Sequence, residues 1–300
     1  VSQNKQFYHC FGCGAHGTAI SFLMDYNGMD FIDAVEELAS RAGRKVPREG
    51  GDFSKKRDNA DLYELMELVV RYFCRQLREH PEAHRAVDYL KQRGLSGELA
   101  EEFELGFAPP GWDNLISALG NSDAAKERLS EVGTTKEKDK GGYYDRFRDR
   151  IIFPIRDQRG RAIGFGGRVL DDSLPKYLNS PETPIFHKGQ ELYGLYQARH
   201  KLKDMEHIYI VEGYMDVLAL AQHGIRNVVA SLGTAVTERY LERLYRVCSQ
   251  IIFCFDGDSA GQKAAWRAME IALPLLKEGR QIHFMFMPEG DDPDTYVHKY

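Results

Sequence analysis

Helical spacing dominates the apolar positions in the first part of the chain. Two short helical patterns cover Ala19–Tyr26 and Phe31–Ala39, and a longer one starts at Asp61 and is followed by another over His84–Lys91. Residues 140–200 change to short apolar runs broken by glycine and proline. The clearest of these runs are Ile151–Ile155 and Ala162–Val169. We therefore expect helices first and a mixed α+β segment after them.

From His207 onward the pattern alternates between strand and helix. Continuous apolar runs are separated by helical patterns, and the runs are Ile208–Val211, Val228–Ala230, Ile251–Phe255 and Ile282–Met287. Apolar strands that alternate with helices indicate a parallel sheet covered on both faces. We predict a small doubly wound domain of βα repeats.

A polar, charged and glycine-bearing segment separates the first helices from the rest. It runs from Pro47 to Ala60, and we interpret it as a linker. The predicted organisation is a compact unit over residues 1–46, a linker over 47–60, an α+β subdomain over 61–206 and an α/β subdomain over 207–300.

The composition indicates a globular protein. Of its 300 residues, 43% are hydrophobic, which is enough for two or three domain cores. No apolar run approaches the roughly 20 residues that cross a bilayer, and the start lacks the pattern of a secretory signal. Five cysteines are too few for a disulfide framework. We expect a cytosolic protein with no membrane partner and, because it opens on Val1, a fragment or processed product.

Charge is distributed unevenly along the chain. The net charge of −5 gives no global sign of a nucleic-acid binder. Between Lys138 and Arg168, however, nine Lys or Arg stand against four Asp. This segment is a basic strip on an acidic protein. Within it we expect Arg159 and Arg161 to be solvated surface charges.

Carboxylates follow three of the predicted strands. They are Glu212 and Asp216 after the first, Asp256 and Asp258 after the third, and Asp292 and Asp294 after the fourth. Because ligands of open α/β sheets bind beyond the carboxyl ends of the strands, we expect these acids to converge. Converging carboxylates raise one another's pKa unless a cation compensates, and Mg²⁺ (or Mn²⁺) is the hard cation that suits them. The pattern indicates phosphoryl or nucleotidyl transfer.

Each acidic motif taken singly has a simpler explanation, because Glu-Gly or Asp-Gly after a strand is usually a turn. The segment Asp256–Gly261 has some likeness to a calcium loop, but Ala260 occupies a ligand position and a strand precedes it. It also has a faint likeness to a phosphatase with an aspartyl nucleophile. That class places its nucleophile after an early strand, whereas here another acid-ended strand comes first.

Three segments resemble the acidic motifs of the Toprim fold, which primases, topoisomerases and some nucleases share: Ile210–Val217, Phe255–Gly261 and Asp292–Asp294. Further segments are similar to bacterial DNA primases, namely Arg146–Ile155, Gly164–Arg168, Pro175–Thr183, Phe186–Gly189 and Leu192–Leu195. The resemblance covers essentially the whole chain. It implies an α/β and α+β protein in which a partial zinc ribbon and a mixed α+β subdomain precede a small Toprim-type parallel sheet with flanking helices.

The resemblance also implies roles for individual residues. The chief metal-site and catalytic acids would be Glu212, Asp256 and Asp258, with Asp216 assisting and Asp292 and Asp294 supporting the metals. A basic ridge would hold the template through Arg93 and Arg168 and the incoming nucleoside triphosphate through Arg146, Lys176 and Tyr177. Arginine forks suit phosphate and tyrosine offers a stacking face, so these residue types fit those ligands.

The front of the chain carries a Cys-x-x-Cys knuckle within Phe7–Gly17. A structural zinc site needs four ligands, and only the pair Cys10 and Cys13 is present. His9 adjoins Cys10 and cannot easily turn inward with it, and His16 could do so only under strain. In bacterial primases an upstream Cys and His complete a zinc ribbon. We interpret a truncated ribbon with Cys10 and Cys13 as ligands and zinc absent or weakly held; two free thiols are the alternative.

The resemblance implies a DNA-dependent RNA polymerase that makes short primers for replication in the bacterial cytoplasm, at the nucleoid. Its partners would be single-stranded DNA, nucleoside triphosphates and, through a C-terminal domain beyond Tyr300, the replicative helicase. Strand cleavage, as in Toprim topoisomerases or nucleases, is one alternative, although a topoisomerase needs a nucleophilic tyrosine on a separate domain. A non-catalytic recombination mediator is another, and retention of all six acids argues against it.

Overall fold

The computed structural model describes residues 1–2, 5–12, 14–27, 31–44, 46, 53–202, 205–233 and 236–299. The chain divides into two compact units, Val1–Ser54 and Lys55–Tyr300. The division falls inside the predicted linker, and residues 47–52 of that linker lie outside the described residues. The predicted boundary between residues 206 and 207 does not appear as a further division and stays a prediction.

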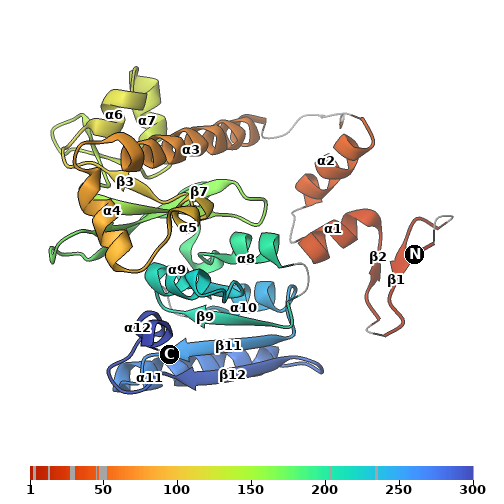
Figure 1. Cartoon of the computed structure of the whole chain (residues 1–300). Helices are drawn as coiled ribbons and strands as arrows, with labels where there is room; N and C mark the ends of the chain where they lie inside the picture. Colours follow the sequence, from red (N-terminus) through yellow and green to blue (C-terminus); the bar gives the residue numbers. More distant parts are fainter. Residues whose placement is uncertain are drawn as a thin grey trace. The chain divides into compact units, whose positions relative to one another are not determined.

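The first unit holds a small hairpin and two helices. Strands β1 (Tyr8–His9) and β2 (His16–Gly17) pair antiparallel, and α1 (Ala19–Asn27) and α2 (Phe31–Arg41) follow them (Figure 1). Both helices were predicted from their apolar spacing and are confirmed. Leu23 in α1 and Ala34 in α2 are buried.

The long helix α3 (Phe53–Glu79) begins earlier than its apolar pattern. The sequence prediction assigned residues up to Ala60 to a linker, and that part of the prediction is corrected, because 53–60 are helical. Residues such as Lys55 and Arg57 have good intrinsic helix propensity without contributing to an apolar stripe. Periodicity therefore could not detect the first turns. Helices α4 (Ala83–Gln92) and α5 (Gly97–Glu102) follow.

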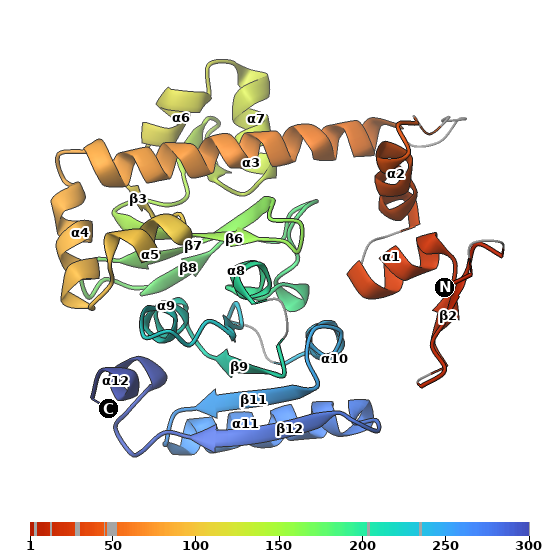
Figure 2. The ribbon, with the colours of Figure 1, turned by 45° about the vertical axis from the view of Figure 1, so that its right-hand side comes forward.

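An antiparallel sheet forms the centre of the α+β half. Its strand order is β3 (Gly106–Ala108), β6 (Arg150–Arg156), β7 (Ala162–Val169) and β8 (Tyr177–Asn179). Figures 1 and 2 show α3 lying along one side of this sheet. Between β3 and β6 the chain forms α6 (Asn114–Leu119), α7 (Asp123–Glu131) and the pair β4 (Thr135–Glu137) and β5 (Tyr143–Asp145). After β8 come a short 3-10 turn η1 (Lys188–Gln190) and α8 (Leu195–Lys201).

The predicted parallel sheet is confirmed. Its order is β10 (Val228–Ala230), β9 (His207–Val211), β11 (Gln250–Phe255) and β12 (Gln281–Phe286), with every pairing parallel. The helices are α9 (Tyr214–Gln222), α10 (Glu238–Leu244), α11 (Ser259–Ala272) with the 3-10 turn η2 (Leu273–Leu275), and α12 (Pro293–Lys299). Helices α8 and α9 lie between the two sheets in both views (Figure 2). None of the helices in the described residues is long and apolar enough to cross a membrane.

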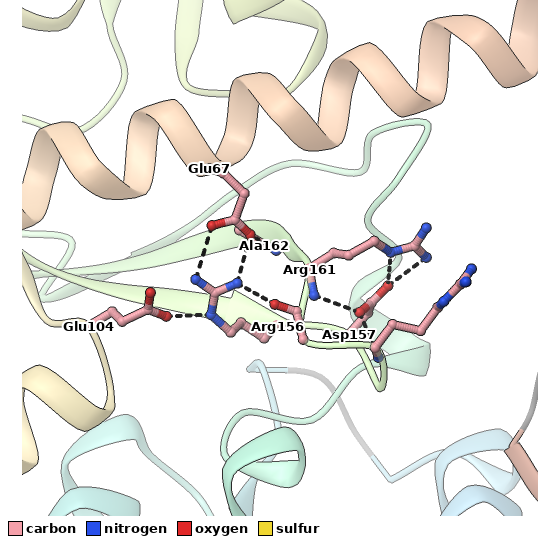
Figure 3. A network of polar contacts seen from close by, with 8 residues as sticks. Glu67, Glu104, Arg156, Asp157, Arg161 and Ala162 are labelled. Carbon is pink, nitrogen blue, oxygen red and sulfur yellow. Dashed lines mark hydrogen bonds and ion pairs between the residues drawn. The ribbon is translucent and has the colours of Figure 1, made fainter. Parts of the chain in front are cut away.

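A buried guanidinium ties α3 to the turn between β6 and β7 (Figure 3). Arg156 donates two hydrogen bonds to Glu67, of 2.7 and 3.2 Å, and others to Glu104 and the carbonyl of Gly160. Its neighbour Arg161 was expected to be a solvated charge, and the structure corrects this. Arg161 donates to Asp157 at 2.8 Å, and its guanidinium carbon lies 3.8 Å from the ring centroid of Tyr63. Long-range packing that periodicity does not reveal is the reason.

Candidate active site

All six predicted acids lie in loops or helix starts that follow the carboxyl ends of parallel strands. Glu212 directly follows β9, and Asp256 directly follows β11. The register pairs Ile251 with Ile208 and Phe253 with Ile210, so these two strands end at the same edge of the sheet. Asp258, Asp292 and Asp294 lie farther along, at the starts of α11 and α12. The remaining acid, Asp216, lies in the first turn of α9.

These carboxylates lie close enough to perturb one another electrostatically. Although the Glu212 residue is exposed, partial desolvation of its carboxylate raises the pKa of Glu212, and the charges of Asp256 and Asp258 raise it further. Burial likewise raises the pKa of Asp256, with Asp292 and then Asp258 adding to the shift. For Asp216, burial followed by the charge of Asp292 raises the pKa to about 7, although a hydrogen bond from the Gly213 N–H opposes the shift. We call this edge of the sheet, with Glu212, Asp216, Asp256, Asp258 and Asp292, the acidic rim. Its negative charges raise one another's pKa values.

Three of the acids use one carboxylate oxygen to hold the start of a helix. Asp216 accepts from the N–H of Gly213 at 2.9 Å, and Asp258 accepts from the N–H of Gly261 at 2.8 Å. Asp292 accepts from both the N–H and the hydroxyl of Thr295 through the same oxygen, each at 2.7 Å. Such caps satisfy N–H groups that the helix leaves unpaired and fix the side chain's direction.

Glu212, Asp256 and Asp294 differ from these three acids. Among the residues that the structure describes, the carboxylates of Glu212 and Asp256 accept no hydrogen bond and form no ion pair; Glu212 is exposed and Asp256 is half-buried. The carboxylate of Asp294 is buried and forms an ion pair with Arg93, and its second oxygen lies 3.3 Å from Nδ1 of His298. The acids thus divide into uncommitted, helix-capping and arginine-paired groups.

The donor set fits a hard divalent cation. All the candidate ligands are carboxylate oxygens, and a cation placed among Glu212, Asp256 and Asp258 would relieve the repulsion that raises the first two pKa values. Within the described residues, no group of three or more His, Cys, Asp or Glu side chains stands in a ready-made metal arrangement. Of the acids at this edge that the structure describes, Glu212 and Asp256 are the two whose carboxylates are wholly uncommitted.

The residues of the predicted basic ridge are Arg93 directly after α4, Arg146 directly after β5, Arg168 in β7, and Lys176 and Tyr177 where β8 begins. Arg168 and Tyr177 are directly opposite each other in the sheet, and the Arg168 guanidinium lies 4.2 Å from the ring centroid of Tyr89. Burial raises the pKa of Tyr177 to about 12, and the charge of Asp216 contributes, so the ridge lies within electrostatic reach of the acids. Lys176 is exposed.

The neighbouring residues of the ridge are already engaged. Nη2 of Arg146 donates to the backbone carbonyl of Asn179 at 3.1 Å, and burial lowers the pKa of Arg146. The ring of Tyr177 packs beside that of Tyr214, 6.1 Å away between centroids. Tyr177 is therefore half-buried, which leaves less of its face for stacking than the sequence prediction assumed.

Sequence reasoning gave no role to Asn179 and Tyr214, which join the two halves of the site. The hydroxyl of Tyr214, two residues after Glu212, donates to Oδ1 of Asn179 at 2.8 Å. Nδ2 of Asn179 donates in turn to the carbonyl of Leu232 at 2.8 Å. Asn179 lies in a segment that resembles bacterial primases and Tyr214 in one that resembles a Toprim motif, but neither resemblance predicts the contact between them.

A further missed feature is an aromatic and arginine cluster next to β5. The Arg148 guanidinium lies 4.2 Å from the ring centroid of Trp112 and 5.4 Å from that of Tyr144. The Trp112 side chain is 62% exposed, which is unusual for a tryptophan. A Trp after Pro-Pro-Gly in an otherwise polar turn was the available sequence signal.

At the front of the chain, backbone hydrogen bonds close around Cys10. The N–H of Gly14 donates to the carbonyl of Cys10 at 2.8 Å, and the N–H of Cys10 donates to that of Ala15 at 2.7 Å. Cys10 is exposed, whereas Cys13 lies outside the described residues. The rings of His9 and His16 lie 5.9 Å apart. Zinc ligation by Cys10 and Cys13 stays a prediction.

A four-stranded parallel sheet with Glu after its first strand and Asp-x-Asp after its third defines a Toprim-type domain. A Toprim-like family model matches residues 209–297, a model of the DNA primase catalytic core, N-terminal domain, matches 72–199, and a CHC2 zinc-finger model matches 1–54. The chain belongs to the family of bacterial DnaG-type DNA primases. The zinc-finger and Toprim matches imply zinc and divalent-metal binding in general.

Individual relatives agree with this assignment. The DNA primase of Pseudomonas aeruginosa is 57% identical over 99% of this chain, which spans 46% of that protein. Among solved structures, a DnaG primase catalytic domain bound to single-stranded DNA is 50% identical, with a TM-score of 0.78 over 81% of this chain and 78% of that one. The zinc-binding and RNA polymerase domains of the Aquifex aeolicus primase are 38% identical, with a TM-score of 0.71 over 100% of this chain and 72% of that one. The chain spans about half the length of the curated relatives it matches.

Proposed function

We propose that this chain is the catalytic part of a primase, which joins nucleoside triphosphates into short RNA primers on single-stranded DNA. The observation that carries the proposal is the pair of uncommitted carboxylates, Glu212 and Asp256, whose pKa values their neighbours raise. The ion pair between Asp294 and Arg93 joins the acidic motifs to a ridge rich in arginine. Carboxylates that can bind a metal, next to arginines that can bind phosphate, suit a reaction in which metal and phosphate are bound together.

In this mechanism each group of side chains has its own task. Glu212 and Asp256 would hold the cation, Asp258 would offer the oxygen that does not cap α11, and Asp292 would support them. Mg²⁺ or Mn²⁺, when bound, lowers the pKa of the attacking 3′-hydroxyl and neutralises charge on the leaving pyrophosphate. Asp216 keeps the turn at Gly213 closed and so fixes the direction of the neighbouring Glu212.

Phosphate groups would bind along the ridge. Lys176, exposed and without an ion-pair partner among the described residues, would meet the triphosphate together with Arg146 and Tyr177. Arg168 and Arg93 would hold the template, and Trp112 with Arg148 would give a base a stacking face. The DNA-bound relative supports this choice of template.

Other parts of the family's activity are proposals for the complete protein. Cys10 and Cys13 would contribute two of the four ligands of a zinc ribbon. Helicase binding would require a C-terminal domain. We place the protein in the bacterial cytoplasm, at replication forks in the nucleoid.

The test replaces Asp256 by Asn and compares it with Glu242→Gln, a change of an exposed acid on α10. The intact chain is incubated with single-stranded DNA, labelled nucleoside triphosphates and Mg²⁺, and DNA affinity is measured separately. We expect Asp256→Asn to lower primer synthesis at least ~100-fold, because a metal ligand is lost, and to leave DNA affinity within about twofold. Primer synthesis at the parent rate, or nicked DNA in place of RNA, would overturn the proposal.

A further inference from the structure

The two acids of the last motif, Asp292-Pro-Asp294, are held in opposite ways. Asp292 uses one oxygen to cap α12 and keeps the other available, half-buried. Asp294 is buried, with only 4% of its side chain exposed, and forms an ion pair with Arg93 from the end of α4. The partners are separated by 201 positions in the sequence. Although the two aspartates are only two residues apart, Asp292 therefore belongs to the acidic rim and Asp294 is bound to the basic ridge.

Burial makes the ion pair of Asp294 hard to exchange for another partner. Burial raises the pKa of Asp294 above its ordinary value, and the charge of Arg93 is the largest of the effects that oppose this shift. His298 adds a second contact, with Nδ1 at 3.3 Å from Oδ1. A buried charge is tolerated when it is paired, and separating such a pair is strongly unfavourable. A cation that bound Asp294 would first have to displace Arg93.

The pair lies in a seam where the segment after α4 meets α9 and α12. Gly94 adopts φ +71°, and a Cβ atom there would lie 2.8 Å from Nε2 of His298, so the backbone approaches α12 closely. Two residues later, the N–H of Ser96 donates to Oε1 of Gln222 at 2.9 Å. The ion pair between Arg93 and Asp294 is thus one of several contacts that hold the segment after α4 against α9 and α12.

We propose that Asp294 is a positioning residue for Arg93 and not a metal ligand, so that the motif divides its work between the rim and the ridge. This inference rests on the proposed function, in which the rim binds the cation and the ridge binds phosphate. Asp294 holds Nη2 of Arg93, and the 36% of the Arg93 side chain that stays exposed meets the ligand. The ligand class is the phosphodiester backbone of the single-stranded template.

The first arm of the test measures Mn²⁺ affinity by calorimetry on the intact chain. We expect Asp294→Asn to bind Mn²⁺ within about twofold of the parent, whereas Asp256→Asn should lose at least ~10-fold, because only Asp256 would supply a ligand. A loss in Asp294→Asn equal to that in Asp256→Asn overturns the inference. No loss in either variant overturns the proposed metal site instead, and the DNA arm then decides the role of Asp294.

The second arm measures DNA affinity in a double-mutant cycle of Arg93→Gln and Asp294→Asn. Each single change should weaken binding of a single-stranded oligonucleotide about tenfold, and the double variant should be no weaker than Arg93→Gln alone, because Asp294 acts through Arg93. Additive losses contradict the inference. The double variant has no unpaired buried charge, so its Mn²⁺ affinity answers the first question even if Asp294→Asn does not fold.

Discussion

Two buried tyrosines in the same aromatic cluster allow a test of how the halves of the site are joined. Tyr214 is 4% exposed, stacks on Phe153 at 4.9 Å between centroids and donates its hydroxyl to Asn179. Tyr193 is 1% exposed and lies 4.7 Å from the Tyr214 centroid. Its hydroxyl finds no hydrogen-bond partner within the described residues. The same change, Tyr→Phe, should therefore have opposite effects at the two positions.

The magnitude follows from the hydrogen-bond partners. Tyr214→Phe leaves Oδ1 of Asn179 without its donor inside the protein, which costs about 1 to 3 kcal/mol of unfolding free energy. For a unit of this size each kcal/mol lowers the melting temperature by about 2 to 4 °C. Tyr193→Phe removes a polar group that is buried without a partner, so the free energy of unfolding should stay equal or rise.

Guanidinium unfolding followed by tryptophan fluorescence measures both effects, because Trp112 and Trp266 both lie in the larger unit. Asn179→Ala combined with Tyr214→Phe is the control, since the two changes remove one shared hydrogen bond and should not add. If Tyr193→Phe destabilises the protein as much as Tyr214→Phe does, the loss comes from packing, and the argument from the hydrogen bond is refuted.

Two other predictions concern charge. The pKa of Asp216 is raised to about 7 from its ordinary 3.8, so the folded state favours the protonated carboxyl. As pH rises from 3.8 to about 7, this preference is lost and the free energy of unfolding falls. Guanidinium unfolding midpoints, measured in buffer free of divalent metal, should therefore be higher for Asp216→Asn than for the parent at about pH 8. The difference should shrink toward about pH 5. A difference that does not change with pH would contradict this prediction. Arg156→Met should lower the free energy of unfolding by about 3 kcal/mol, the lower end for a broken buried ion pair, because Glu67 and Glu104 are partly exposed. Arg161→Met should lower it by at most about 1 kcal/mol, as expected for a more exposed ion pair. Equal losses for the two variants in thermal unfolding would show that burial does not set the difference.

The sequence by itself determined the order of elements and the position of the acids along it. Alternation of apolar runs with helical patterns after His207 was sufficient to predict a parallel sheet, and a parallel sheet brings its strand ends to one edge. The sequence alone therefore predicts that Glu212 and Asp256 lie at the same edge of the sheet. Local capping was readable as well, because Asp258 and Gly261, or Asp292 and Thr295, are three residues apart.

The tertiary structure decided which of those acids are available. Nothing near Asp294 in the sequence announces Arg93, and nothing near Tyr214 announces Asn179, since both pairs form only when separate elements pack together. Arg161 combines both cases, because its carboxylate partner Asp157 is only four residues away, whereas the ring of Tyr63 comes from the distant helix α3. Periodicity and capping depend on neighbours within a few residues, whereas a buried ion pair depends on the folded surface that excludes water from it.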